Sequence, residues 1–317
     1  MRGAGRPAAS CSPHWLPEPG TKVLNLAMGA VTYYLALPFI YLLSYLPFRA
    51  LYLVSDVMYF FVYRVLGYRK AVVTTNLERS FPEKSPDEID AIRRDFYRYF
   101  CDLSLETLKT LTVSPAALND HMSCGDMSAF EHFFEKKQSV IIVMGHLGNW
   151  ELCGAYFSQL PLHPLYVIYH PLRDKHFDGL FYRMRTRLGN GLYPMKSTFK
   201  CMIRDRDKLT ATAFIADQSP SPKNAHWMTF LNQDTAVFRG TETLARKLDY
   251  PVIYLSVIRE RRGHYRLHSE LLVEHPGELP ENLLTELHTR RLEQDIIAHP
   301  ATWLWSHRRW KHQRPDA

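Results

Sequence analysis

The sequence predicts an α/β fold in which a mixed, largely parallel sheet is flanked by helices, with membrane-associated helices at the N-terminus. Two observations support the sheet. Short apolar runs typical of strands alternate with helical patterns, and the sequence contains no internal repeat of the kind that a solenoid would show. A third observation concerns the start of the chain, where 26 consecutive residues from Val23 to Phe48 carry no formal charge. We therefore expect one α/β domain that follows an apolar helical region.

The overall composition is typical of a folded chain. The 317 residues are 46% hydrophobic and 22% charged, which excludes disorder as the dominant state. Lys and Arg number 39 and Asp and Glu number 32, so the formal net charge of +7 favours acidic partners such as an anionic membrane, a phosphorylated substrate or an acidic protein. The five cysteines include no C-x-x-C pair, so neither a zinc site nor a disulfide framework is indicated.

Three regions follow from the distribution of charge and apolar residues: a flexible leader over 1–21, a membrane-anchoring helical region over 22–70, and an α/β domain over 71–317. As a helix, the uncharged segment would be about 39 Å long, enough for a hydrocarbon core of about 30 Å. A second apolar stretch, Ala50 to Tyr63, contains Asp56 and is better interpreted as an interfacial or core helix. A buried helical hairpin within a soluble domain is the alternative interpretation.

The α/β region begins with a long amphipathic helix over Asp87 to Leu111, for which Ser85 and Pro86 are the start signal. Apolar runs then predict strands at Val140 to Met144, Leu165 to Tyr169, Thr210 to Ala216 and Val252 to Val257. Helices are expected near 149–159, 174–188, 197–206 and 239–249, with a last helix at Glu281 to Ala298. Trp227 to Leu231 and Tyr265 to Val273 are expected to add edge strands.

The most informative motif is His146-Leu147-Gly148-Asn149-Trp150-Glu151, directly after the strand that ends at Met144. Ligand sites of α/β sheets collect at the ends of strands. If Glu151 accepts one imidazole N–H of His146, the other ring nitrogen is free to take a proton from a substrate hydroxyl. The alternative is that His146 satisfies a backbone group and Glu151 is a solvated charge at a helix start. Neither H-E-x-x-H nor a Cys/His cluster supports a metal site.

Three segments together resemble one known family. Val140 to Gly154, Asn76 to Pro82 and the terminal Trp305 to Lys311 are similar to the lipid A biosynthesis acyltransferases, the lauroyl/myristoyl transferase branch of the lysophospholipid acyltransferase superfamily. The resemblance covers roughly residues 22 to 314. It implies an α/β fold, an N-terminal helix in the bacterial inner membrane, and a His146/Glu151 dyad that deprotonates a hydroxyl as this attacks an acyl thioester. The distribution of Lys and Arg around the apolar segment favours a catalytic domain on the cytoplasmic side.

The same resemblance suggests further substrate-binding residues. Arg185 matches the family's Arg-containing helix and would hold anionic groups by its planar fork, although a solvated basic helix face is the alternative. Asp217 ends a strand and would orient the sugar, a loop or a basic residue, or else only form a turn. Arg173 lies near a family Tyr-Arg-Pro pattern in which this chain has His170 in place of Arg, so either the substrate contact of that Arg has moved to Arg173 or it is absent.

The resulting hypothesis is a membrane-associated enzyme that moves an acyl chain to a hydroxyl of a lipid A precursor or related glycolipid, without a cofactor. The donor implied by the resemblance is an acyl carrier protein, or else acyl-CoA, and an acidic carrier suits the positive chain. Alternative acceptors are an aminolipid, a glycerolipid or a phosphatidylinositol mannoside. A different class, a non-catalytic membrane-anchored lipid-binding protein, also stays open. No motif supports nucleic-acid binding.

Overall fold

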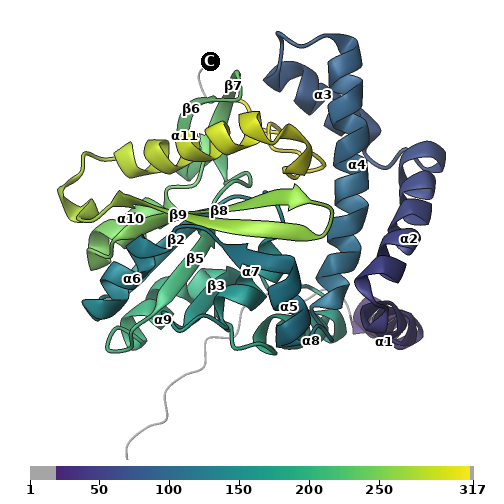
Figure 1. Ribbon diagram of the computed structural model, residues 1–317, viewed down its shortest axis with the longest axis horizontal. Coiled ribbons are helices and arrows are strands. Elements are labelled where there is room, and N and C mark those ends of the chain that lie inside the picture. The colour runs from purple at the N-terminus through teal and green to yellow at the C-terminus, as the bar shows by residue number, and fades with distance from the viewer. Residues whose placement is uncertain (1–18, 315–317) are drawn as a thin grey trace, which may run out of the picture.

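A seven-stranded sheet forms the centre of the molecule in the computed structural model, which describes residues 19–314 (Figure 1). The strand order is β1-β9-β8-β2-β5-β3-β4. All neighbouring strands run parallel except β8 and β9, which form an antiparallel hairpin. The strands are β1 (Met122–Cys124), β2 (Val140–Met144), β3 (Leu165–Tyr169), β4 (Gly191–Pro194), β5 (Ala211–Ile215), β8 (Val252–Arg261) and β9 (His264–Val273). The predicted mixed, largely parallel sheet is thus confirmed.

Both predicted edge strands differ from the expectation. The segment Trp227 to Leu231 falls in β6 (His226–Phe230), which pairs with β7 (Gln233–Val237) in a separate two-stranded hairpin. Strand β9 is not at an edge, because the short strand β1 pairs with its outer side. Strands β1 and β4 are the true edges of the sheet, and each is too short to show a pattern in the sequence.

Helices cover both faces of the sheet, and β2 illustrates why. Its alternate residues point to opposite faces, and all five are buried. Ile141 and Val143 pack on the side of α10 (Gly240–Leu248) and α11 (Leu283–Ala298). Val140, Ile142 and Met144 point to the opposite face. There they pack on the side of α5 (Pro115–His121), α6 (Ser128–Glu135) and α7 (Trp150–Phe157). The remaining helices after β3 are α8 (Lys175–Thr186) and α9 (Thr198–Arg204).

Helix α4 (Pro86–Lys109) stands beside one end of the sheet and carries the N-terminal helices (Figure 1). It begins where the sequence predicts, because Ser85 and Glu88 form a reciprocal capping box. Around it lie α1 (Pro19–Tyr45), α2 (Phe48–Tyr59), a π-helical turn at Phe60–Val65, and α3 (Lys70–Ser80).

The predicted 26-residue apolar helix is interrupted before its end. Helix α1 ends at Tyr45, and the chain bends through Leu46 and Pro47 into α2. No single helix in the described part of the chain combines the length and apolarity of a membrane span, whereas Phe48–Val65 and Lys70–Ser80 pass that test together with an 86° bend between them. The predicted leader over 1–21 lies outside the described residues as far as residue 18, and 19–21 belong to α1.

Two histidines, the buried His288 and the half-buried His307, make the stability of this fold sensitive to acid. Burial lowers the pKa of His288 on α11 and that of His307 near the C-terminus, each to about 4. In the unfolded chain both would titrate near pH 6.5. The unfolded chain therefore binds more protons below pH 6.5, and the free energy of unfolding falls as the pH drops from 6.5 towards 4.

We predict that His288→Leu, which removes one of these groups, makes the free energy of unfolding less dependent on pH in that window. Urea titrations of the wild type and the variant at pH 7.5, 6.0 and 5.0 measure this dependence. An equally steep loss of stability in the variant would show that protonation of His288 does not contribute.

Candidate active site

The site is built where two neighbouring parallel strands end. β2 and β5 pair in register, with Met144 opposite Ile215. The loop from Gly145 to Asn149 follows β2, and Asp217 comes two residues after β5. Because the carboxyl ends of adjacent parallel strands meet at one edge of the sheet, His146 and Asp217 are brought side by side although 71 positions separate them in the chain.

Asp217 is the hydrogen-bond partner of His146. Its Oδ1 lies 2.5 Å from His146 Nδ1, and its Oδ2 accepts a 2.7 Å hydrogen bond from the backbone N–H of His146. The indole N–H of Trp303 donates to the same Oδ2 at 2.7 Å. Burial raises the pKa of the Asp217 carboxyl, but the imidazole of His146 and these hydrogen bonds outweigh burial and hold the pKa at about 2. Asp217 therefore stays ionised at neutral pH.

The structure gives Glu151 a different partner from the one the sequence suggests. Its two carboxylate oxygens accept hydrogen bonds from Arg185, at 3.0 Å from Nε and 2.5 Å from Nη2. Within residues 19–314, no hydrogen bond joins Glu151 to His146, so the predicted His146/Glu151 contact is replaced by the His146–Asp217 pair. The burial of Arg185 lowers its pKa, but the Glu151 carboxylate has the larger effect, and the pKa of Arg185 is raised.

His146, Glu151 and Arg185 line one cavity of about 530 Å³, and Asp217 lies behind His146. Its polar lining includes His146, Glu151, Arg185 and Asn190. The apolar lining comes from both sides of the gap between the sheet and α7, and includes Ile142, Phe157, Leu165, Ala213 and Leu255. A site of this size with an apolar lining and few polar groups suits an elongated apolar ligand whose reactive end faces the histidine.

Arg173 lies outside this cavity. It is exposed in the loop between β3 and α8, whereas its neighbours His170 and Leu172 line the cavity. Of the five predicted site residues, the structure therefore brings four to one place, namely His146, Glu151, Arg185 and Asp217. The fifth, Arg173, is not among them.

The loop that carries His146 is held from two sides. On one side, Leu147 forms an isolated antiparallel bridge with Trp303, and the Gly148 N–H donates to the Thr302 carbonyl at 3.0 Å. On the other side, Tyr99 of α4 donates its hydroxyl to the Gly148 carbonyl at 2.5 Å. Gly148 has φ +62°, and a Cβ there would lie 2.0 Å from the Val257 carbonyl oxygen, so only glycine fits.

Trp303, Tyr99 and Asn149 are supporting residues that sequence reasoning did not assign to the site. Asn149 is the N-cap of α7, where its Oδ1 accepts the Leu152 N–H at 2.9 Å. The sequence does carry a signal for this cap, since Asn before a helical pattern is favoured. Trp303 is recognisable only as part of a terminal group of tryptophans, and nothing in that group indicates the Asp217 contact.

The arrangement fits proton transfer at His146 Nε2. Asp217 holds Nδ1, so Nε2 is the ring nitrogen left for a substrate. The side-chain amide nitrogen of Gln218 lies 3.4 Å from Nε2. Trp150 packs edge-on against the imidazole with ring centroids 4.8 Å apart. Among the described residues, no three His, Cys, Asp or Glu side chains converge as metal ligands would.

The fold and this site define an α/β protein in which a His–Asp pair faces an apolar cavity. The family model for the bacterial lipid A biosynthesis acyltransferase matches residues 19–312, and the chain belongs to this family. The protein is therefore a transferase of the lipid A acyltransferase family, which acts with an acyl donor and a lipid acceptor. This confirms the resemblance seen in the three sequence segments.

Two curated proteins are similar to the chain over most of their length. One is the lipid A biosynthesis palmitoleoyltransferase of Escherichia coli (strain K12), and the other is the lipid A biosynthesis acyltransferase of Shigella flexneri. Each is 21% identical over 246 residues, which cover 77% of this chain and 79% of the relative.

We predict that Asp217→Asn lowers kcat by roughly 10²–10⁴-fold, the range that general acid–base groups contribute. The variant keeps a side chain of the same shape but loses the negative charge that stabilises a protonated His146. Steady-state transfer assays at saturating acceptor measure the effect. Asp207→Asn, at an exposed aspartate outside the cavity, is the control with unchanged kcat. Full activity of Asp217→Asn would contradict the assigned partner of His146.

Proposed function

We propose that the protein transfers a fatty acyl chain from an acyl carrier protein thioester to a hydroxyl of a lipid A precursor at a membrane surface. The observation that carries the proposal is the His146–Asp217 pair on the wall of an apolar cavity. Family membership supports the same reaction class, because it requires an acyl donor and a lipid acceptor.

In the proposed mechanism His146 is the general base. Its Nε2 takes the proton of the acceptor hydroxyl while the oxygen attacks the thioester carbonyl carbon, and the negative charge of Asp217 stabilises the imidazolium that forms. The tetrahedral intermediate then collapses with cleavage of the C–S bond. The proton on Nε2 passes to the departing thiolate, which leaves an ester and a free thiol and returns His146 to its neutral state.

Arg185 is proposed to bind an anionic group of the substrate. Glu151 occupies two of its guanidinium nitrogens, Nε and Nη2, so Glu151 fixes the plane of the guanidinium in the cavity wall. Glu151 then serves as a positioning residue for Arg185 rather than for His146. Arg173, exposed beside the cavity-lining Leu172, would contact only parts of a substrate that extend outside the cavity.

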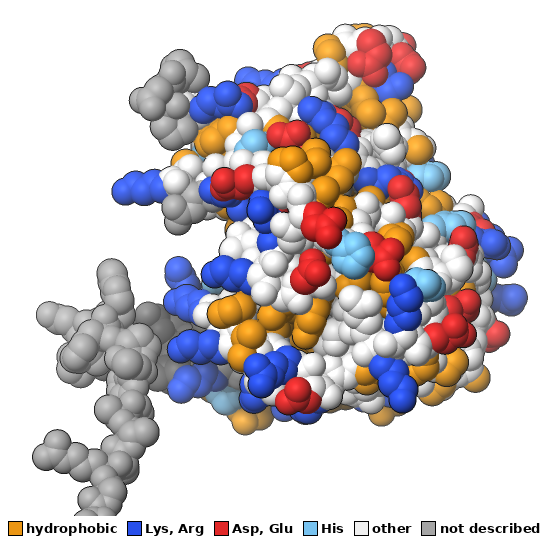
Figure 2. Space-filling view, turned by 90° about the vertical axis from the view of Figure 1, so that its left-hand side faces the viewer, with side chains coloured by type: hydrophobic (Ala, Val, Ile, Leu, Met, Phe, Trp, Pro, Cys, Tyr) orange, Lys and Arg blue, Asp and Glu red, His pale blue; other side chains and the backbone are white. Residues whose placement is uncertain are grey.

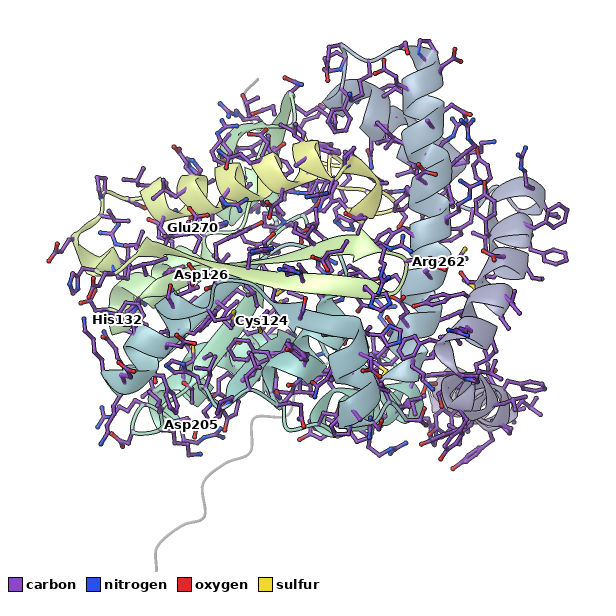
Figure 3. The ribbon with its side chains drawn as sticks, viewed as in Figure 1. Cys124, Asp126, His132, Asp205, Arg262 and Glu270 are labelled. Carbon is purple, nitrogen blue, oxygen red and sulfur yellow. The ribbon has the colours of Figure 1, made fainter. Side chains whose placement is uncertain are left out.

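Membrane association is supported by an exposed apolar face on the N-terminal helices. On α1 the exposed apolar residues recur every three or four positions, so they share one side of the helix, and each is more than half exposed: Val31, Tyr34, Leu35, Phe39, Leu42 and Tyr45. Further apolar side chains more than half exposed follow along α2 and the π-helical turn: Leu53, Val57, Phe60, Phe61 and Val65. Side chains of this region stand out at the right-hand edge of the molecule in Figure 3.

A lipid surface is the partner that fits this face, because soluble monomeric proteins rarely expose an apolar patch of this extent to water. Helix α1 also touches the cavity region, since Tyr33 packs against His176 and Phe177 of α8. A membrane bound at α1 would thus lie near the helix that carries Arg185. We propose the bacterial inner membrane as this surface, with the α/β domain on its cytoplasmic side.

The choice of an acyl carrier protein as donor rests on charge. The chain has 39 Lys and Arg against 32 Asp and Glu, and Lys and Arg side chains gather along the lower left of the face in Figure 2. An acidic carrier is attracted to such a surface, and the attraction weakens as salt screens it.

We predict that the purified protein moves an acyl chain from acyl carrier protein to a lipid A precursor, and that His146→Ala lowers the turnover by at least 10²-fold. Mass spectrometry of the lipid product measures the transfer, and acyl-CoA in place of the carrier tests the donor. Unchanged turnover in His146→Ala would exclude the proposed base. Lipid binding without transfer by the folded wild type would favour a lipid-binding protein.

We further predict that Leu35→Glu combined with Leu42→Glu weakens binding to liposomes that contain anionic lipid. Both side chains are on the exposed apolar face of α1, where a charge opposes insertion among acyl chains. Ile297→Glu on α11 is the matched control, because Ile297 is 58% exposed but lies on a different helix. Vesicle flotation measures the bound fraction, and equal flotation of both variants would exclude the α1 face as the contact.

A further inference from the structure

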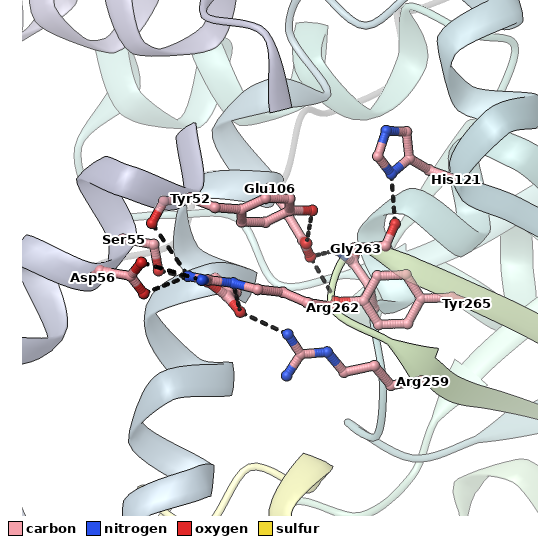
Figure 4. A network of polar contacts seen from close by, with 11 residues as sticks. Tyr52, Ser55, Asp56, Glu106, His121, Arg259, Arg262, Gly263 and Tyr265 are labelled. Atoms are coloured by element: carbon pink, nitrogen blue, oxygen red, sulfur yellow. Dashed lines mark hydrogen bonds and ion pairs between the residues drawn. The ribbon is translucent and has the colours of Figure 1, made fainter. Parts of the chain in front are cut away.

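A fully buried carboxylate, Glu106 of α4, lies behind the loop that carries His146. Its Oε2 accepts hydrogen bonds from the Asn149 side-chain amide and from the Tyr265 hydroxyl, each at 2.7 Å. Its Oε1 accepts a third hydrogen bond, from the Tyr52 hydroxyl of α2, also at 2.7 Å. Figure 4 shows Glu106 between the two tyrosine hydroxyls. The three donors come from α2, from β9 and from the N-cap of α7.

Glu106 lies outside the catalytic cavity and does not touch His146 or the substrate space. Burial of a carboxylate without hydrogen bonds is costly, so a side chain with no exposed surface is retained only with its partners in place. Burial raises the pKa of Glu106, and the hydrogen bonds from Tyr265 and Tyr52 oppose this rise. The mechanism described above makes no use of this group.

The link from Glu106 to catalysis runs through Asn149. Asn149 uses its amide N–H to reach Glu106 and its Oδ1 to accept the Leu152 N–H, so its side chain is fixed at both ends. The same residue ends the loop that begins at Gly145 and carries His146. Tyr99, also on α4, holds the adjacent Gly148 carbonyl. Helix α4 therefore sets the position of the loop through two contacts at neighbouring residues.

We propose that Glu106 is a positioning residue for acyl transfer: through Asn149 it fixes the loop that holds His146 in reach of Asp217 and of the cavity. This inference rests on the proposed function of His146. The second carboxylate oxygen, Oε1, anchors Glu106 to α2, one of the helices with the exposed apolar face. The loop is thereby joined to the membrane-facing helices through a single buried side chain.

The Asn149–Glu106 contact allows a reciprocal exchange of donor and acceptor. In Asn149→Asp two carboxylates face each other, so this variant loses the hydrogen bond. In Glu106→Gln the side-chain carbonyl oxygen still accepts from the Asn149 amide, and the NH₂ group faces the Tyr52 hydroxyl, so this variant keeps the bond. In the double variant the Gln amide donates to the Asp carboxylate, and Asp still caps α7, since Asp and Asn are comparable N-cap residues. The double variant therefore restores both the bond and the cap.

We expect Asn149→Asp to lower kcat by about 10–100-fold with a smaller change in KM, because misplacement of a catalytic group by about 1 Å costs up to about 10²-fold. Glu106→Gln, which keeps the bond, should stay within about fivefold of the wild type. The double variant should recover kcat to within about fivefold of the wild type. Ser55→Ala is the control, since Ser55 donates to the neighbouring buried Asp102 at 2.6 Å and has no link to Asn149. It should lower Tm without lowering kcat. A double variant no more active than Asn149→Asp, or an Asn149→Asp variant with reduced Tm and unchanged kcat, would overturn the proposal.

Amide hydrogen exchange over residues 145–152 gives a readout that does not depend on turnover. Exchange should become faster in Asn149→Asp and return towards the wild-type rate in the double variant. If the wild type proves unable to transfer an acyl chain, the proposed function fails, and the exchange rates still decide whether Glu106 orders the loop. Equal exchange in the wild type and all variants would overturn that role.

Discussion

The site depends on one hydrogen bond, between the buried Asp217 carboxylate and the imidazole of His146. Asp217 is 6% exposed and accepts three hydrogen bonds, from the His146 ring, the His146 backbone and the Trp303 indole. These contacts tie together the ends of β2 and β5 and the segment after α11. An ionised carboxylate is stable at this depth only because all three donors are present. Loss of any of them would disturb the orientation of His146 as well as the packing around it.

The parallel register of β2 and β5 is what makes this pair possible, and it explains how far the sequence could predict the site. Each strand is visible as an apolar run, and His146 and Asp217 are each visible as polar residues just after a run. Periodicity along one chain does not reveal which strands are neighbours in the sheet, however. The sequence therefore favours the carboxylate nearest in the chain, Glu151, although the partner of His146 comes from an adjacent strand. Glu151 in turn is neutralised by Arg185, which also lies outside its local sequence.

For the fold as well, the sequence predicts the long elements and misses the short ones. Strands β2 and β3 and helix α4 are long enough for their apolar spacing to be read, and Ser85 marks the start of α4. Strands β1 and β4 have 3 and 4 residues and are defined only by their pairing with β9 and β3. The hairpin of β6 and β7 turns through Leu231 and Asn232, both with positive φ, and an apolar residue at such a position gives no turn signal in the sequence. The break between α1 and α2 is also only partly predictable. Pro47 is visible in the sequence as a local cause of the break, but the direction of the bend is set by the packing of both helices on α4.

The pairing of Glu151 with Arg185 has a consequence for what the cavity can admit. Both charges line a space whose remaining surface is mostly apolar, and they cancel each other at contact distance. A hydrocarbon chain that enters the cavity therefore does not strip water from an isolated ion, which would be far more costly than displacing water from a closed pair. The two residues supply directed hydrogen-bonding groups at the reactive end, and together they add no net charge to the wall. Because the Glu151 and Arg185 charges are paired, the same cavity suits both a hydrocarbon chain and a polar headgroup.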